Sequence, residues 1–275
     1  MKHKCYKSLD SFVSLNSLDM HSADLYNFGS SSIAVYTSSA PGNNSNNEDH
    51  VSIYPLERKK IVLAVADGAG GHSNGAEASA FAISKLSQAI GNIDMHRGGE
   101  LGAIMTGIDN ANKSILNELS GSASTIAVVE IQDNIVRTYH VGDTEVLIVG
   151  RKGKIKHQTL NHSPVGYAVE AGLLSEESAA LYEERHLVSN LLGFENMHIA
   201  VSGPTRMDKY DSLIIATDGL FDNLHKTEVI EAIRKGNLDQ CCDTLIQLAK
   251  ERMQGMDEGK PSKSDDMSFI IFRLN

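Results

Sequence analysis

The segment IVLAVADG (residues 61–68) decides how this 275-residue chain folds. Its first six residues form a continuous apolar run that predicts a fully buried β-strand, and the run ends at Asp67 followed by a glycine. A single Asp-Gly pair is common in turns and by itself indicates no function. The segment LIIATDG (residues 213–219) repeats the pattern, so two buried strands are expected to end in carboxylates.

Acidic residues occur at further places where a strand is expected to begin or end. They are Glu48-Asp49, Asp143 and Asp265-Asp266. Carboxylates brought close together repel one another, and a divalent cation is the simplest way to compensate them. Oxygen ligands without Cys or His clusters suit hard cations such as Mg²⁺ or Mn²⁺, which bind phosphate oxygens. The pattern therefore favours metal-assisted hydrolysis of a phosphate ester.

The order of the expected elements indicates an α+β fold. Strands are expected at 32–37, 51–56, 61–66, 125–131, 135–141, 145–149, 213–217 and 268–274, and a further strand is expected to begin at 155. Helices are expected at 76–90 and 100–119. Two more helices are expected to run from a cap at Thr227 to about Gly236 and from a cap at Asp239 to about Met253. Consecutive strands joined by tight turns are antiparallel, and helices do not alternate strictly with strands, which argues against a doubly wound parallel sheet. Residues 161–197, with one helix that Ser175 would cap, are expected to form an insertion.

Composition excludes several classes of protein. The formal net charge of −10 argues against a nucleic-acid partner. The three cysteines lack metal-binding spacing, which indicates a reducing compartment. No apolar stretch approaches the roughly 20 residues of a membrane helix, so we expect a cytoplasmic protein without membrane attachment.

The glycine-rich segment after Asp67 does not resemble a nucleotide-binding loop. Residues 68–75 contain neither G-x-x-x-x-G-K-[ST] nor G-x-G-x-x-G, and they are better explained as clearance around a metal site. A phosphotransferase of the haloacid dehalogenase type is also excluded, because its D-x-D pattern is absent where Asp67 is followed by Gly68-Ala69.

Six motifs in a fixed order resemble the protein phosphatase 2C (PPM) family of metal-dependent serine/threonine phosphatases, in its bacterial form. They are NNEDH (46–50), VADGAGGH (65–72), SASTIAVV (122–129), YHVGDTEVLI (139–148), ATDGLFDNL (216–224) and SDDMSFIIFRL (264–274). The resemblance implies a four-layer α-β-β-α sandwich, in which helices flank two antiparallel sheets. It places the catalytic domain at residues 31–275, with a flap at about 161–197, and leaves residues 1–30 as an N-terminal extension of uncertain order.

The resemblance also implies a centre of two Mn²⁺ or Mg²⁺ ions, or three, with a bridging hydroxide that attacks the phosphate. Asp67 would bridge two ions, Asp218 and Asp265 would complete one ion's shell, the Gly68 carbonyl with Glu48 would serve the other, and Asp143 with Asp218 would hold a third. Asp49 would bond a metal-bound water. The residues expected to act in catalysis are Asp49, Asp67 and Asp218.

Two positions depart from the family pattern. The Arg that grips the substrate phosphate in many members is replaced by Asn44, and the His that follows Asp-Gly in animal members is replaced by Ala69. His72 lies nearby, and we interpret it as a structural or supporting group rather than the proton donor.

The predicted activity is hydrolysis of phosphoserine and phosphothreonine in proteins. The expected substrate is a phosphoprotein, the expected counterpart is a serine/threonine kinase, and the expected state is a monomer. The alternative is a non-catalytic regulatory module that binds phosphoproteins, which the missing Arg favours and the full set of carboxylates opposes.

Overall fold

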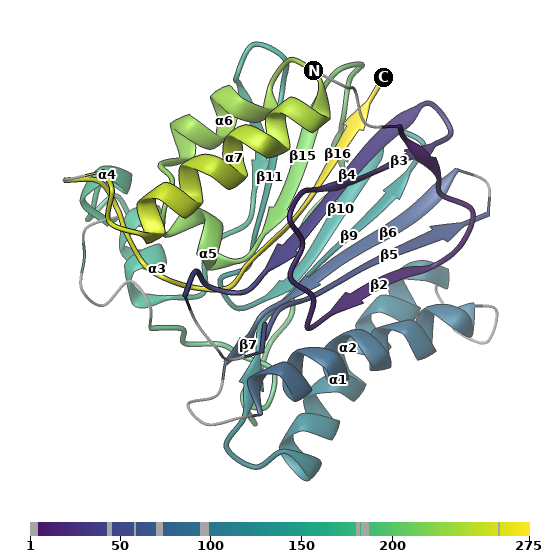
Figure 1. Ribbon diagram of the computed structural model, residues 1–275. Coiled ribbons are helices and arrows are strands. Elements are labelled where there is room, and N and C mark those ends of the chain that lie inside the picture. Colours follow the sequence, from purple (N-terminus) through teal and green to yellow (C-terminus); the bar gives the residue numbers. More distant parts are fainter. Residues whose placement is uncertain are drawn as a thin grey trace.

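The computed structural model describes residues 5–42, 46–57, 59–69, 74–93, 99–179, 182, 187–257 and 259–275 (Figure 1). Its helices are α1 (Gly75–Gly91), α2 (Gly99–Glu118), α3 (Pro164–Glu170), α4 (Glu176–Ala179), α5 (Asp218–Phe221), α6 (Lys226–Ile233) and α7 (Leu238–Met253). Helices α1, α2, α6 and α7 confirm the four helices that the sequence predicted, at 76–90, 100–119, 227–236 and 239–253.

The strands form two large sheets and one small one. The first sheet has the order β1 (Lys7–Ser8), β3 (Asp24–Phe28), β4 (Ser31–Ser38), β16 (Met267–Leu274), β15 (Ser212–Ala216), β11 (Glu145–Val149) and β12 (Ile155–Gln158). The second has the order β13 (Ala200–Val201), β10 (Ile135–Val141), β9 (Ile126–Gln132), β6 (Lys60–Ala66), β5 (His50–Leu56) and β2 (Val13–Asn16), with β14 (Thr205–Arg206) also on β10. The small sheet pairs β7 (Gly68–Ala69) with β8 (Ala123–Ser124). Neighbouring strands are antiparallel except β1 and β3, which are parallel.

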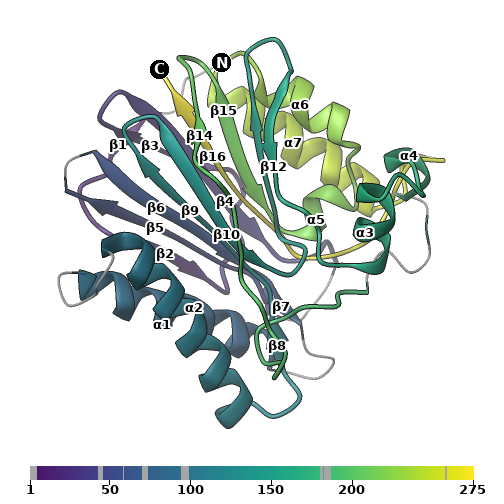
Figure 2. The ribbon, with the colours of Figure 1, turned by 180° about the vertical axis from the view of Figure 1, so that it is seen from behind.

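The two sheets face each other and helices cover their outer faces, which confirms the predicted α-β-β-α sandwich. Helices α6 and α7 pack on the first sheet, and α1 and α2 pack on the second (Figures 1 and 2). A separate apolar layer lies between the sheets. No described helix is long and apolar enough to cross a membrane.

Strand β6 shows why a continuous apolar run was needed. Residues alternate between the two faces of a strand, so residues 61, 63 and 65 enter the layer between the sheets, while residues 62, 64 and 66 pack against α1 and α2. Each of these six side chains is at most 1% exposed. Both faces of the strand are therefore covered, and neither tolerates polar residues.

Two predicted helix caps are wrong. Helix α6 is preceded by His225 rather than capped at Thr227, and the Glu228 carboxylate accepts a hydrogen bond from the His225 backbone at 2.9 Å. Helix α7 is capped by Asn237, whose side-chain oxygen accepts from the backbone of Asp239 at 3.0 Å. In both cases the chain enters the helix about two residues earlier than expected. Asn237 is a favoured capping residue, whereas His225 precedes α6 through the bond of its backbone to Glu228.

The described part of the insertion contains one helix more than the sequence indicated. Ser175 accepts a hydrogen bond from the backbone of Ser178 at 3.1 Å and caps α4 as predicted. Helix α3 comes before it, capped by Ser163, which accepts from the backbone of Gly166 at 2.9 Å, and it has a proline in its first turn. Two turns of helix are too short to show a clear apolar period, which is why this helix was not predicted.

The sequence left the order of the N-terminal residues open, and residues 5–28 here contain three strands. Strand β3 pairs with β4, and β2 extends the second sheet beside β5. Phe12 stacks on Tyr54 with ring centroids 4.8 Å apart. This segment thus covers edges of both sheets.

Candidate metal centre

The predicted site residues come together at one end of the sandwich, where some strands begin and their antiparallel neighbours end. Glu48 and Asp49 precede β5, Asp67 and Gly68 follow β6, Asp143 lies between β10 and β11, Asp218 follows β15 as the first residue of α5, and Asp265 precedes β16. Antiparallel pairing explains the gathering, because the end of one strand lies beside the start of the next.

Asp67 lies at the middle of this group. Burial raises the pKa of its carboxyl well above the usual range, and the negative charges of Asp49, Asp218, Asp143 and Asp265 raise it further. Electrostatic coupling of this kind requires short separations, because protein and water weaken it with distance. The structure therefore brings all five predicted aspartates into one cluster.

The pKa values of two neighbouring carboxyls are raised as well, although the charge of Lys263 opposes the rise. Burial, followed by the charge of Asp218, raises the pKa of Asp143 to about 8. Burial and then Asp218 also raise the pKa of Asp265. Only a positive group could hold these side chains ionised at neutral pH. An all-oxygen donor set with this deficit suits a hard divalent cation.

Glu48 and Gly68, which were expected to serve one ion together, lie on either side of Gly75. A Cβ atom on Gly75 would lie 2.5 Å from Glu48 Oε2 and 2.8 Å from the Gly68 carbonyl oxygen. The two oxygens thus face the same small space, which only a glycine leaves open. The Asp67 backbone is anchored close by, since its carbonyl accepts hydrogen bonds from Thr125 N and Ser124 Oγ, each at 2.8 Å.

Asp49 joins the two sheets. It is 1% exposed, and its Oδ2 accepts a hydrogen bond from Thr217 Oγ1 at 3.0 Å, so a residue before β5 contacts a residue after β15. Its buried Oδ1 has no hydrogen-bond partner among the described residues. Burial raises the pKa of this carboxyl, as do the charges of Asp266 and Asp218. A buried acceptor without a donor is well suited to a water or substrate atom.

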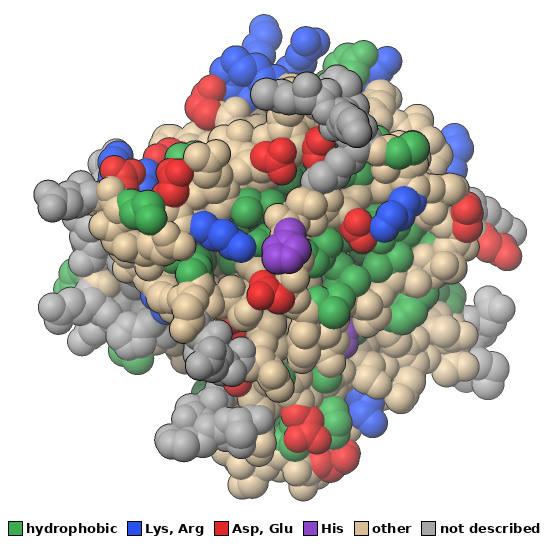
Figure 3. Space-filling model, in the orientation of Figure 1, with side chains coloured by type: hydrophobic (Ala, Val, Ile, Leu, Met, Phe, Trp, Pro, Cys, Tyr) green, Lys and Arg blue, Asp and Glu red, His purple; other side chains and the backbone are tan. Residues whose placement is uncertain are grey.

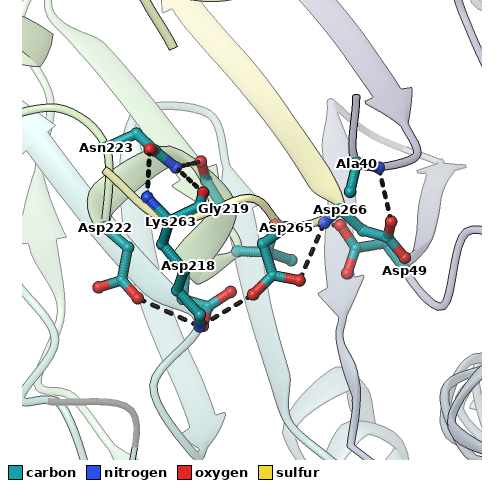
Figure 4. Close-up of polar contacts among 10 residues, drawn as sticks. Ala40, Asp49, Asp218, Gly219, Asp222, Asn223, Lys263, Asp265 and Asp266 are labelled. Carbon is teal, nitrogen blue, oxygen red and sulfur yellow. Dashed lines mark hydrogen bonds and ion pairs between the residues drawn. The ribbon is translucent and has the colours of Figure 1, made fainter. Parts of the chain in front are cut away.

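Asp266 is a supporting residue to which the sequence assigned no role. One oxygen accepts a hydrogen bond from Ala40 N at 2.8 Å, and its own backbone N–H donates to Asp265 Oδ1 at 2.9 Å (Figure 4). Its other oxygen accepts from Glu48 N at 2.7 Å. It therefore fixes Glu48 and Asp265 relative to each other. The acidic doublet directly before a strand was the only available signal.

Lys263 was not predicted to belong to the site at all. Its Nζ lies 2.5 Å from Asp218 Oδ2, 2.8 Å from Asp265 Oδ2 and 3.2 Å from Asp222 Oδ2 (Figure 4). Burial would lower the pKa of this ammonium, but the three carboxylates outweigh burial and raise it. Within the described ranges, no three His, Cys, Asp or Glu side chains are arranged as a ready metal site.

The other positions that the sequence analysis singled out are described only in part. Ala69 is exposed at the end of β7, whereas Asn44 and His72 lie outside the described residues. At the root of the predicted flap, His162 Nδ1 accepts a hydrogen bond from Gly142 N at 3.1 Å, and His162 N donates to Gly142 O at 3.1 Å. This part of the insertion is thus attached directly beside Asp143.

A group of basic side chains separate from Lys263 lies far from the carboxylates. Lys and Arg gather at the top of Figure 3, toward the tip of the β11–β12 hairpin. There Arg151 and Lys209 both stack on Tyr210, at 5.3 and 4.8 Å from the ring centroid. This group is at the opposite end of β11 from Asp143.

Comparisons with known proteins agree with this fold. The family model described as "Protein phosphatase 2C" matches residues 38–254. The serine/threonine protein phosphatase PstP of Mycobacterium tuberculosis is 28% identical over 213 residues, which are 74% of this chain and 39% of that protein. The serine/threonine phosphatase structure from S. agalactiae has a TM-score of 0.75 and 26% identity, and it covers 89% of this chain and 100% of that one. The PstP catalytic domain in complex with two manganese ions has a TM-score of 0.68 and 23% identity, with 88% and 97% covered.

Proposed function

Because the chain belongs to the protein phosphatase 2C family, we propose that it hydrolyses phosphoserine and phosphothreonine in proteins, with Mn²⁺ or Mg²⁺ as cofactor. The observation that carries the proposal is the position of Asp67, whose carboxyl is surrounded by the charges of four other aspartates. Lys263 compensates this cluster only in part, so the cluster is unfavourable unless it also binds cations.

The chain's own residues divide into two groups of donors around Asp67. Asp218 and Asp265 would hold one ion with Asp67, while the Gly68 carbonyl and Glu48, which face the same space beside Gly75, would serve the other. Asp143 with Asp218 would hold a third ion. When bound, such ions activate the attacking water and neutralise the charge that develops on the phosphoryl oxygens.

Asp49 is suited to orient the attacking water. Thr217 occupies its Oδ2, and its Oδ1 remains available to accept a hydrogen bond. Since burial and neighbouring acids raise the pKa of this carboxyl, it would also take up a proton readily. The two sheets meet at this residue, so its position is fixed by the fold.

The test is release of phosphate from an aryl phosphate and from a phosphopeptide by the purified protein. We expect activity with Mn²⁺ or Mg²⁺, none in chelator, and a fall in kcat of at least about 10³-fold in both Asp67→Asn and Asp218→Asn. Asp133→Asn is the matched control, because Asp133 lies exposed in the β9–β10 turn. Full activity of both site variants, or of the chelated protein, would refute the metal assignment.

The same assay separates a phosphatase from a phosphoprotein-binding module without turnover. A module would bind a phosphopeptide and leave it intact at every metal concentration. The position that favours this alternative, Asn44, lies outside the described residues. The complete cluster of aspartates favours turnover.

A further inference from the structure

Lys263 places a positive charge among the carboxylates that are expected to bind an ion. Its ammonium nitrogen contacts Asp218 and Asp265, both proposed ligands, and also Asp222, which is not one (Figure 4). Its side chain is 28% exposed, and those of Asp218 and Asp222 are 18% and 16% exposed, whereas that of Asp265 is 36% exposed. The pairs with Asp218 and Asp222 are therefore partly desolvated, and their attraction is stronger than that of a surface ion pair.

The backbone of Lys263 is held firmly, so only its side chain is free to change partners. Asn223 is fully buried, and its side chain accepts a hydrogen bond from Lys263 N at 2.9 Å and donates to Lys263 O at 2.8 Å. The same amide donates to Gly219 O at 2.9 Å. Arg252 in turn donates to Asn223 O at 3.0 Å. These contacts tie the Lys263 loop to the helix that begins with Asp218.

An ammonium and a divalent ion cannot share the same carboxylate oxygens at contact distance, because both are positive. We propose that Lys263 is a built-in competitor for the divalent cation at Asp218 and Asp265. In the metal-free protein its ammonium holds these two carboxylates together. When a divalent ion binds, the ammonium leaves both oxygens and keeps Asp222, whose Oδ2 is already 3.2 Å away.

The proposal rests on the proposed metal centre and adds a consequence to it. Binding of a divalent ion becomes an exchange of cations, so the affinity for the ion is weaker than the carboxylates alone would give. Lys263 is a positioning residue in this account, since it acts on the ligands and not on the substrate. Its contribution to stability should exist in the metal-free protein and disappear in the loaded one.

The experiment is calorimetric titration of the chelator-treated protein with Mn²⁺ alone, together with thermal unfolding in chelator and in saturating Mn²⁺. Lys263→Met, which keeps the length and apolar character of the side chain, should bind Mn²⁺ at least about 10-fold more tightly than the wild type, which is about 1.4 kcal/mol. The same variant should have a lower Tm in chelator and an unchanged or higher Tm in Mn²⁺. Lys263→Arg should keep the weaker affinity.

Lys260→Met is the matched control, because Lys260 is exposed in the same loop, and it should leave both measurements close to the wild type. Equal loss of Tm in chelator and in Mn²⁺, with unchanged affinity, would show that Lys263 stays on its partners and would overturn the proposal. An equally large increase in Mn²⁺ affinity in Lys260→Met would also overturn it, since the loss of any nearby positive charge would then explain the effect. If neither wild type nor Lys263→Met binds Mn²⁺, the metal centre itself fails.

Discussion

The two Asp-Gly pairs look alike in the sequence and differ in the structure. After β6, Asp67-Gly68 continues as an extended segment, β7, which pairs with β8. After β15, Asp218-Gly219 begins the short helix α5. Both glycines are needed for a close approach of backbone and neither has a positive φ. The same dipeptide therefore leads from a buried strand into an extended segment in one case and into a helix in the other.

The charges around the two aspartates also differ. The four charges that raise the pKa of Asp67 all belong to other aspartates. Burial raises the pKa of Asp218 as well, but the nearby ammonium of Lys263 opposes the rise. The ends of β6 and β15 thus position their carboxylates in a similar way. Loops distant in the sequence determine which charges lie near each carboxylate.

The largest expected effect comes from the two glycines. An alanine Cβ would lie 2.1 Å from Gly75 O at position 68 and 1.9 Å from Asp266 O at position 219, and backbone atoms cannot move aside cheaply. We expect Gly68→Ala and Gly219→Ala each to lower the free energy of unfolding by roughly 3 kcal/mol or more, measured by urea denaturation. The larger loss should occur at position 219, next to the central strand β16.

Gly91→Ala provides the control for this comparison. Gly91 ends α1, and an alanine methyl group at this position would have no atom within 4 Å, so the change should be neutral or stabilising by up to about 1 kcal/mol. Losses below about 1 kcal/mol at both Gly68 and Gly219 would show that the close approaches do not constrain the site.

A smaller effect should separate the two aspartates in the metal-free protein. Asp67→Asn removes a buried charge whose neighbours are all acidic, so we expect the free energy of unfolding in chelator to rise by about 2 kcal/mol. Asp218→Asn also removes a buried charge but deprives Lys263 of a partner, and its gain should be at least about 1 kcal/mol smaller. An equal or larger gain at Asp218 would mean that Lys263 does not compensate it.

The smallest expected effect is on the pH dependence of stability in chelator. The folded pKa of Asp143 is raised to about 8 from 3.8, so the folded state binds its proton more tightly than the unfolded state does. Stability from this group is greatest at low pH and is lost as pH rises toward 8, by at most about 1.4 kcal/mol per pH unit. Above about pH 7.5 the histidines with lowered pKa contribute little, because their unfolded pKa is about 6.5 and they are then nearly uncharged in both states.

We therefore expect the metal-free protein to lose stability between about pH 7.5 and 8, as measured by urea denaturation at several pH values. Saturating Mn²⁺ should flatten this loss. Asp218→Asn should reduce the slope, because the negative charge of Asp218 is the first of the charges that raise the pKa of Asp143. A slope that is the same in chelator and in Mn²⁺ would contradict the expectation.

Much of the fold could be predicted because period and composition are local properties. The runs at 61–66 and 213–216 are apolar at every position, and both proved to be strands covered on two faces. Helices α1 and α2 were found from their apolar period, whereas α6 and α7 were predicted from capping residues. Two helix caps were misplaced, because suitable polar residues occur at neighbouring positions and only the backbone shows which one is used.

The sequence by itself determined the sandwich, the strands that carry carboxylates and the aspartates that gather at one end. Only the tertiary structure decided how those carboxylates are supported and compensated. Asp266 fixes Glu48 across 218 residues of sequence, and Lys263 reaches Asp218 across 45. Such contacts depend on the pairing of β16 with β4 and β15, which brings a distant loop beside the cluster. Local sequence patterns carry no information about side chains that meet only through the packing of sheets.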